Sequence, residues 1–164
     1  MKPMQTINYN TVQLRPQTMQ FFIDNLLLLA LTLCGYGYAG IEKMPLSSLF
    51  LWLSVLLSLV LAYRFVYLKR MAYLITGEQL IYEHGVFVRS NEYIELYRVV
   101  DFGERSGLLQ QLVGLKNVSV YSGDRTTPRL DIIGVDIHKE VVPFIRERVA
   151  QNKRKNGIYE ITNR

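Results

Sequence analysis

The sequence predicts a membrane-anchored α+β protein, in which a two-helix transmembrane hairpin precedes a mostly β domain that ends in a helix. Three observations lead to this fold class. Two long apolar runs follow each other near the N-terminus, short apolar runs separated by turn residues begin near residue 70, and an amphipathic stripe lies near the C-terminus. A chain of 164 residues is long enough for an anchor and one small domain.

The two apolar runs extend from Phe21 to Ile41 and from Leu46 to Leu68. Each is close to the roughly 20 residues that a helix needs to cross about 30 Å of hydrocarbon. The short connection between them allows only an antiparallel hairpin with both chain ends on one side. We therefore predict four parts, which are an N-terminal segment over 1–20, the hairpin over 21–68 (spans 21–41 and 46–68), a folded domain over 70–153 and a tail over 154–164.

The distribution of charge predicts which side of the membrane the domain occupies. The formal charge is +5, but residues 71–164 hold 13 Lys and Arg against 12 Asp and Glu, which leaves only +1 there. The excess flanks the hairpin, at Lys2, Arg15, Arg64, Lys69 and Arg70, while the loop between the spans holds Lys43 beside Glu42. Because basic flanks stay on the cytoplasmic side, we expect both termini and the folded domain in the cytoplasm. Basic residues that are not gathered on one face of the domain argue against nucleic acid as a partner.

Small residues predict close packing of the two spans. Ser54, Ser58 and Ala62 recur every four residues on the second span, and Gly35 and Ala39 form a shorter stripe on the first. Such stripes let helix backbones approach each other in a membrane. The spacing leaves open whether the contact lies within one hairpin or between protomers.

Asp24 and Arg64 are the charged residues inside the apolar runs. In an antiparallel hairpin they lie at similar depth, near the inner end. Two interpretations are equally compatible with this position: the side chains form an intramembrane ion pair, or each extends separately to the headgroups.

The residues after Arg70 predict an antiparallel sheet or barrel, because short apolar runs alternate with residues that favour turns. The expected strands are Ala72 to Thr76, Leu80 to Glu83, Val86 to Val88, Tyr93 to Leu96, Val99 to Phe102, Val118 to Tyr121 and Leu130 to Ile133. Two segments break this pattern. A short helix is expected over Ser106 to Gly114, closed by Gly114, and a final amphipathic helix from about His138 to Lys153, with Asp136 as its N-cap.

Several motifs in this part resemble the bacterial pleckstrin-homology-like (bacterial PH) family. They are Tyr73-Leu74-Ile75-Thr76, Glu95-Leu96-Tyr97-Arg98-Val99, Ser106-Gly107-Leu108-Leu109-Gln110-Gln111-Leu112-Val113-Gly114-Leu115 and Val118-Ser119-Val120. The resemblance covers roughly residues 70 to 150. It implies a PH-like, partly open seven-stranded β-barrel capped by a C-terminal helix, a location in the bacterial inner membrane, and a family largely without assigned catalytic activity.

The chain contains no motif that predicts catalysis. The two histidines, His84 and His138, are far apart and have no cysteine partner, since Cys34 lies in the first apolar run. Phosphate-binding, nucleophile-elbow and dinucleotide fingerprints are absent from the sequence. We therefore expect no enzyme activity, no cofactor and no metal.

Basic residues at two places are candidates for contact with anionic lipid. Lys69 and Arg70 close the second span, and Lys153, Arg154 and Lys155 follow the final helix. For the second group, a solvated helix end is the alternative. A phosphoinositide site in the first β hairpin is not expected, because Glu78 would repel a phosphate there.

These features predict a non-enzymatic, membrane-anchored interaction or assembly module whose partners are membrane lipid and either another protein or a second copy of the chain. The alternative is a ligand-sensing effector, in which a small molecule enters the barrel and drives association of the hairpins. The tail from Gly157 to Arg164 is expected either to dock as a strand or to remain disordered.

Overall fold

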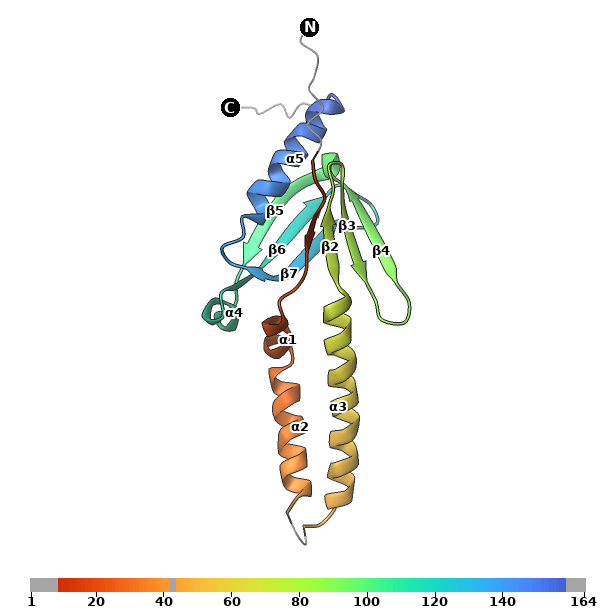
Figure 1. The fold of residues 1–164 in the computed structure, drawn as a ribbon, viewed down its shortest axis with the longest axis vertical. Helices are drawn as coiled ribbons and strands as arrows, with labels where there is room; N and C mark the ends of the chain where they lie inside the picture. Colours follow the sequence, from red (N-terminus) through yellow and green to blue (C-terminus); the bar gives the residue numbers. More distant parts are fainter. Residues whose placement is uncertain (1–8, 42–43, 159–164) are drawn as a thin grey trace.

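The computed structural model describes residues 9–41 and 44–158 of the chain (Figure 1). Its elements, in chain order, are β1 (Val12–Leu14), α1 (Thr18–Asp24), α2 (Leu26–Ala39), α3 (Ser47–Arg70), β2 (Ala72–Ile75), β3 (Gln79–His84), β4 (Ser90–Glu95), the 3₁₀ turn η1 (Leu96–Arg98), β5 (Val99–Arg105), α4 (Leu108–Leu112), β6 (Leu115–Ser122), β7 (Arg129–Asp136) and α5 (Val141–Lys155). The predictions that involve Lys2, Glu42 and Lys43, and most of the tail prediction, concern residues outside the described ranges.

The helix α3 has 24 residues and is long and apolar enough to cross a membrane, and 11% of its most apolar stretch is buried. The first apolar run differs from the single straight helix expected for it, because α1 and α2 meet at an angle of 70° at Asn25. Counted together, they make a second helix of spanning length. The Asn25 side chain donates to the carbonyl oxygen of Phe21 at 2.9 Å, and such local bonds of Asn compete with regular helix geometry.

The first sheet is antiparallel, with the strand order β1-β2-β3-β4. Its edge strand β1 comes from the N-terminal segment, where the sequence analysis placed no strand. Val12 pairs with Ile75, and Leu14 pairs with Tyr73. Three residues are too few to show the alternation by which a strand is recognised. The chain therefore begins this sheet, leaves it to form the three helices, and returns to it at β2.

The second sheet has the order β5-β6-β7, so the described residues form seven antiparallel strands in two open sheets. The expected strand at Val86 to Val88 is wrong: these residues form a loop between β3 and β4. Gly85 explains the turn, since its φ is +108° and a Cβ added there would lie 1.9 Å from the Val88 carbonyl oxygen. With β1 added and this run removed, the number of strands is still seven.

Two helices complete the β domain. The short helix α4 is followed by Gly114, whose φ of +70° agrees with the expected helix end. The final helix α5 starts at Val141, and its N-cap is Glu140 rather than Asp136. Asp136 instead accepts a hydrogen bond from the His138 backbone N–H at 2.9 Å, which closes the turn before the helix.

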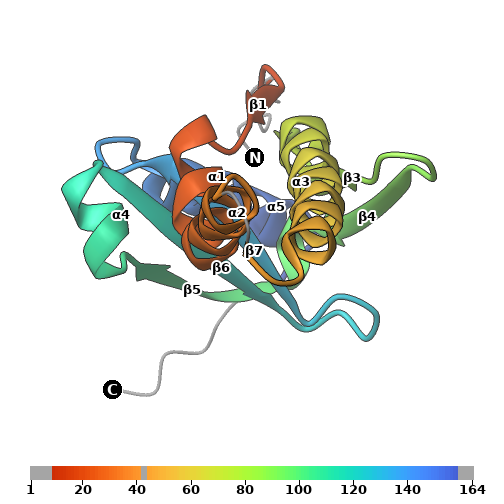
Figure 2. The same cartoon turned by 90° about the horizontal axis from the view of Figure 1, so that it is seen from below.

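One apolar core joins the sheets, α5 and the upper part of the helical hairpin. Its fully buried members include Leu80, Ile94, Ile132 and Ile145. The same cluster includes Phe21, Leu61 and Leu68 of the hairpin. Figures 1 and 2 show α2 and α3 leaving one end of the β domain side by side, while α5 ends at the opposite end of the molecule. The hairpin and the β domain are thus packed together as one body.

Candidate functional site

The helix α3 passes into β2 with a single residue, Met71, between them. Met71 is buried, and its backbone N–H donates to the carbonyl oxygen of Leu68 at 3.2 Å. Lys69 and Arg70 therefore lie at a fixed junction, where the apolar helix ends and the first sheet begins. Cations in the last turn of a helix are also favoured by the helix dipole.

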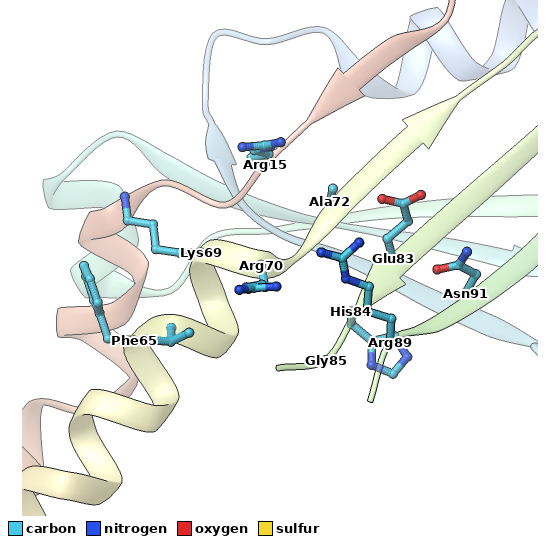
Figure 3. Close-up of a pocket in the computed structure, with 11 residues that line it drawn as sticks. Arg15, Phe65, Lys69, Arg70, Ala72, Glu83, His84, Gly85, Arg89 and Asn91 are labelled. Carbon is cyan, nitrogen blue, oxygen red and sulfur yellow. The ribbon is translucent and has the colours of Figure 1, made fainter. Parts of the chain in front are cut away.

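An open hollow of about 710 Å³ lies beside this junction (Figure 3). Four cationic side chains line it: Lys69 and Arg70 from α3, Arg15 from the segment before α1, and Arg89 from the loop before β4. Glu83 is the one carboxylate among the lining residues, so four positive charges face one negative charge, a difference of three. Segments that are far apart in the sequence thus create one strongly positive site.

Most of these cations are free to bind a ligand. Within the described part of the chain, the side chains of Arg15, Arg70 and Arg89 form no hydrogen bond or ion pair, whereas that of Lys69 donates to the Thr18 hydroxyl at 2.6 Å. Guanidinium groups donate in a planar fork that fits the oxygens of phosphate and carboxylate. The hollow therefore has the chemistry of an anion site.

His84, the last residue of β3, forms part of the wall of the hollow. Its ring stacks on Tyr82, with centroids 4.5 Å apart, and the Tyr67 hydroxyl lies 3.2 Å from its Nδ1. The Glu92 carboxylate lies 3.4 Å from Nε2. Burial raises the pKa of the Tyr82 phenol above its ordinary value, so Tyr82 is neutral at physiological pH. The second histidine, His138, is exposed at the turn before α5.

The small residues of the helices face each other within the hairpin at its middle. A Cβ added to Gly35 would lie 2.2 Å from the Ser54 Oγ, and Ser54 is fully buried. One turn along α3, the Ser58 hydroxyl lies 3.0 Å from the Tyr36 hydroxyl. At the ends of the two stripes, Ala39 is half-buried and Ala62 is exposed.

Arg64 pairs with Asn25, and not with the adjacent Asp24 that one of the two sequence interpretations suggested. Arg64 donates from Nη1 to the Asn25 side-chain oxygen at 2.8 Å. Asp24 instead accepts a hydrogen bond from the Gln20 side chain at 2.7 Å. Because of the bend between α1 and α2, the consecutive residues Asp24 and Asn25 have different partners. The similar depth of Asp24 and Arg64 in the hairpin, on which the sequence interpretation rested, could not reveal this bend.

The basic run Lys153, Arg154 and Lys155 lies at the end of α5, away from the helical hairpin (Figure 1). Lys155 forms an ion pair with Glu78, and this contact lowers the pKa of the Glu78 carboxyl. These residues therefore do not share a surface with Lys69 and Arg70, and the two predicted groups of lipid contacts lie at opposite ends of the β domain (Figure 1).

Sequence reasoning did not identify Arg89 as a site residue and used Arg15 only for orientation. Neither lies near Arg70 in the sequence, and no motif links them, because the fold of the first sheet brings them together. Among the residues that the structure describes, no group of three or more His, Cys, Asp and Glu side chains is arranged to hold a metal ion.

Comparison with known families supports the sequence-based resemblance. The profile of the family described as Bacterial PH domain matches residues 25–153, a range that includes α2 and α3 as well as the β domain up to α5. No curated protein and no solved structure shows a significant match to the chain. Because the matched range covers most of the chain, this protein belongs to the bacterial PH domain family.

Proposed function

We propose that the protein is a non-enzymatic, membrane-anchored interaction module of the bacterial inner membrane. In this proposal the hairpin crosses the bilayer, both termini and the PH domain are cytoplasmic, and the hollow at the junction binds the headgroups of anionic lipids. The domain is then presented at the membrane surface to another protein or to a second copy of the chain. The observation that carries the proposal is the gathering of four cationic side chains in one hollow beside the end of α3: Lys69 and Arg70 from α3 itself, with Arg15 and Arg89.

The exposure of the hairpin supports the anchor. Trp52 is 72% exposed, Leu59 64% and Leu27 75%, so the outer faces of both helices are apolar. Each square ångström of apolar surface left in water costs about 25 cal/mol, and lipid removes that cost. The positive flanks of the hairpin support a cytoplasmic position of its open end in this proposal.

The position of the hollow supports headgroup binding. Phe65 and Val66 of α3 form its apolar side, and Lys69 and Arg70 follow within one turn. This order from apolar to basic matches the order from acyl chain to phosphate in a leaflet. Each basic residue near an anionic surface contributes about 1 kcal/mol. The hollow offers cations for binding and no paired nucleophile and base, so the proposal includes no catalysis.

The test measures which lipids remain bound to the protein after purification in a mild detergent, by native mass spectrometry. We expect phosphatidylglycerol to be retained over phosphatidylcholine. The double variant Arg70→Gln with Arg89→Gln should reduce that preference by roughly five-fold per residue, the equivalent of about 1 kcal/mol each.

A matched control for this experiment is Arg125→Gln, at an exposed position between β6 and β7 that does not line the hollow. This variant should keep the preference of the wild type. Equal retention of both lipids by the wild type, or equal losses in the control and the double variant, would contradict headgroup binding at this site.

A second candidate function is sensing of a small soluble anion. The hollow lies where the hairpin meets the β domain, so a ligand bound there could change how hairpins associate. A ligand site inside the barrel, between the two sheets, is less favoured, because buried side chains such as Leu80, Val120 and Ile132 fill that space. Displacement of retained lipid by free phosphate compounds, with a change in oligomer mass, would favour sensing over a lipid site.

A further inference from the structure

Two groups of exposed apolar side chains extend from the β domain beside the hairpin. One is the β3–β4 tip, defined as Phe87 and Val88, which are 89% and 80% exposed. The other is the α4 tip, defined as Leu108 and Leu112, which are 82% and 84% exposed. In Figure 1 the β3–β4 loop and α4, which carry these tips, lie at the end of the domain from which the hairpin leaves, and Figure 2 shows the loop and α4 on opposite sides of the hairpin.

A contact with α3 determines how far the β3–β4 tip extends along the hairpin. The Phe87 ring stacks on Tyr63, with centroids 6.1 Å apart and an angle of 15° between the ring planes. Tyr63 precedes the end of α3 at Arg70 by seven residues, which is about 10 Å along a helix. The tip therefore extends well beyond Lys69 and Arg70 along the hairpin, toward its apolar middle.

A buried hydrogen-bond network fixes the position of the α4 tip beside the hairpin. Gln110 on the inner side of α4 donates to the Gln20 side chain of α1 at 2.9 Å and to the Asn117 side chain of β6 at 2.9 Å. Leu108 and Leu112 are four residues apart and so lie on one face of the short helix. The contact with Gln20 holds this apolar face beside α1, whose own Phe22 is 48% exposed.

The arrangement of charge around the β3–β4 tip identifies the surface that covers it. Arg89 is the next residue after the tip, and it faces the basic hollow together with Arg70. Apolar side chains at the level of the hairpin, followed by cations at the end of α3, match the acyl and phosphate layers of one leaflet. The tips also continue the exposed apolar surface of the hairpin, so a single bilayer would cover all of them.

We propose that both tips insert into the cytoplasmic leaflet, on the two sides of the hairpin, at the boundary between headgroups and acyl chains. The proposal rests on the membrane anchor described above and adds a defined orientation of the β domain. The three attachments, the hairpin with a tip on each side, oppose tilting of the domain toward either tip. The opposite end of the domain, where α5 ends, then faces the cytoplasm.

Quenching of tryptophan fluorescence by brominated lipids tests the proposal. The full chain is reconstituted in vesicles of phosphatidylethanolamine and phosphatidylglycerol that contain brominated acyl chains. Trp52 is the single tryptophan of the chain and reports on the hairpin in the wild type. In a Trp52→Phe background, single tryptophans are introduced by Phe87→Trp, Leu112→Trp and Val100→Trp.

Val100 is the matched control, because it is 70% exposed and is the second residue of β5, near the end of that strand away from α4. We expect strong quenching at positions 52, 87 and 112, and at most weak quenching at position 100. Quenching at 52 with positions 87 and 112 equal to the control would overturn the tip insertion and leave the anchor intact. Quenching at only one tip would overturn the two-sided attachment, and no quenching at 52 would overturn the anchor and the insertion together.

Discussion

Arg64 donates from Nη1 to the side-chain oxygen of Asn25 at 2.8 Å and thereby joins α3 to the break between α1 and α2. Both polar atoms of the Asn25 amide are engaged, since its Nδ2 donates to the Phe21 carbonyl oxygen at 2.9 Å. One side chain thus completes the end of α1 and accepts the guanidinium of the facing helix. In the proposed anchor, this contact lies at the inner end of the hairpin.

The first prediction compares Asn25 with its neighbour Asp24. Asn25→Leu should destabilise the hairpin by about 1.5–3 kcal/mol, the range for hydrogen bonds to charged groups, because Arg64 loses its acceptor. Asp24→Asn should destabilise the hairpin less, since the Asp24 side chain is hydrogen-bonded to Gln20 and not to Arg64. Thermal unfolding in detergent, followed by circular dichroism, measures both. A greater loss for Asp24→Asn would show that Arg64 depends on the carboxylate instead.

The second prediction concerns the contact between α2 and α3. Gly35→Ala should destabilise the hairpin, because the new Cβ would lie 2.2 Å from the Ser54 Oγ. Gly37→Ala is the matched control, since a Cβ there meets nothing within 4 Å and alanine favours a helix over glycine by about 1 kcal/mol.

The double variant Gly35→Ala with Ser54→Ala should recover most of the stability, because the nearest remaining atom, the Ser54 Cβ, lies at 3.5 Å. The fraction of folded protein is measured as sodium dodecyl sulfate is titrated into mild detergent. If Gly35→Ala unfolds at the same point as Gly37→Ala, the helices do not meet at this residue.

The third prediction concerns Arg148 of α5, which is buried and donates to the backbone carbonyl oxygens of Ile75, Thr76 and Asn10 at 2.6–2.8 Å. Burial lowers the pKa of its guanidinium, yet the group remains cationic at neutral pH because arginine titrates far above it. Arg148→Lys should cost about 1–3 kcal/mol, since one ammonium group cannot reach all three acceptors.

The control for Arg148 is Arg146→Lys, two residues earlier on the exposed face of the same helix. Its guanidinium lies 5.7 Å from the Phe102 ring centroid and is held by no buried acceptor among the described residues. The melting temperature of this variant should stay close to that of the wild type. Equal shifts for the two lysine variants would disprove a special role for Arg148.

The fourth prediction is a loss of stability at high pH. Burial raises the pKa of both Tyr73 and Tyr82 above the ordinary value of 10.0. Above pH 10 the unfolded chain loses these protons while the folded chain keeps them, so the unfolded state binds fewer protons and the free energy of unfolding falls as pH rises. Below about pH 9 these two groups should contribute no slope.

Urea denaturation between pH 8 and pH 11 measures this dependence. Tyr82→Phe should reduce the loss of stability, and Tyr93→Phe, at a 50% exposed position on β4, serves as the control. An unchanged loss in Tyr82→Phe would show that other groups cause the alkaline transition.

Local patterns in the sequence were sufficient for much of the architecture. Long apolar runs predicted the hairpin, and alternating short runs with glycine turns predicted most strands. The end of α4 at Gly114 followed from the same kind of reasoning, as did the apolar stripe of α5. The resemblance to the bacterial PH family is confirmed by the family match. In each case the signal lies within a few neighbouring residues, whose spacing reflects helix or strand geometry directly.

Only the tertiary structure decided which distant residues meet. β1 is too short to be recognised alone and becomes a strand because β2 provides its hydrogen-bonding partners. Arg15 and Arg89 join Lys69 and Arg70 only because the first sheet folds back beside α3. Arg64 pairs with Asn25 rather than Asp24 because the chain bends by 70° at Asn25, between α1 and α2. The sequence by itself determined the elements, whose causes are local, and the packing of those elements determined the site, because its charges come from segments far apart in the chain.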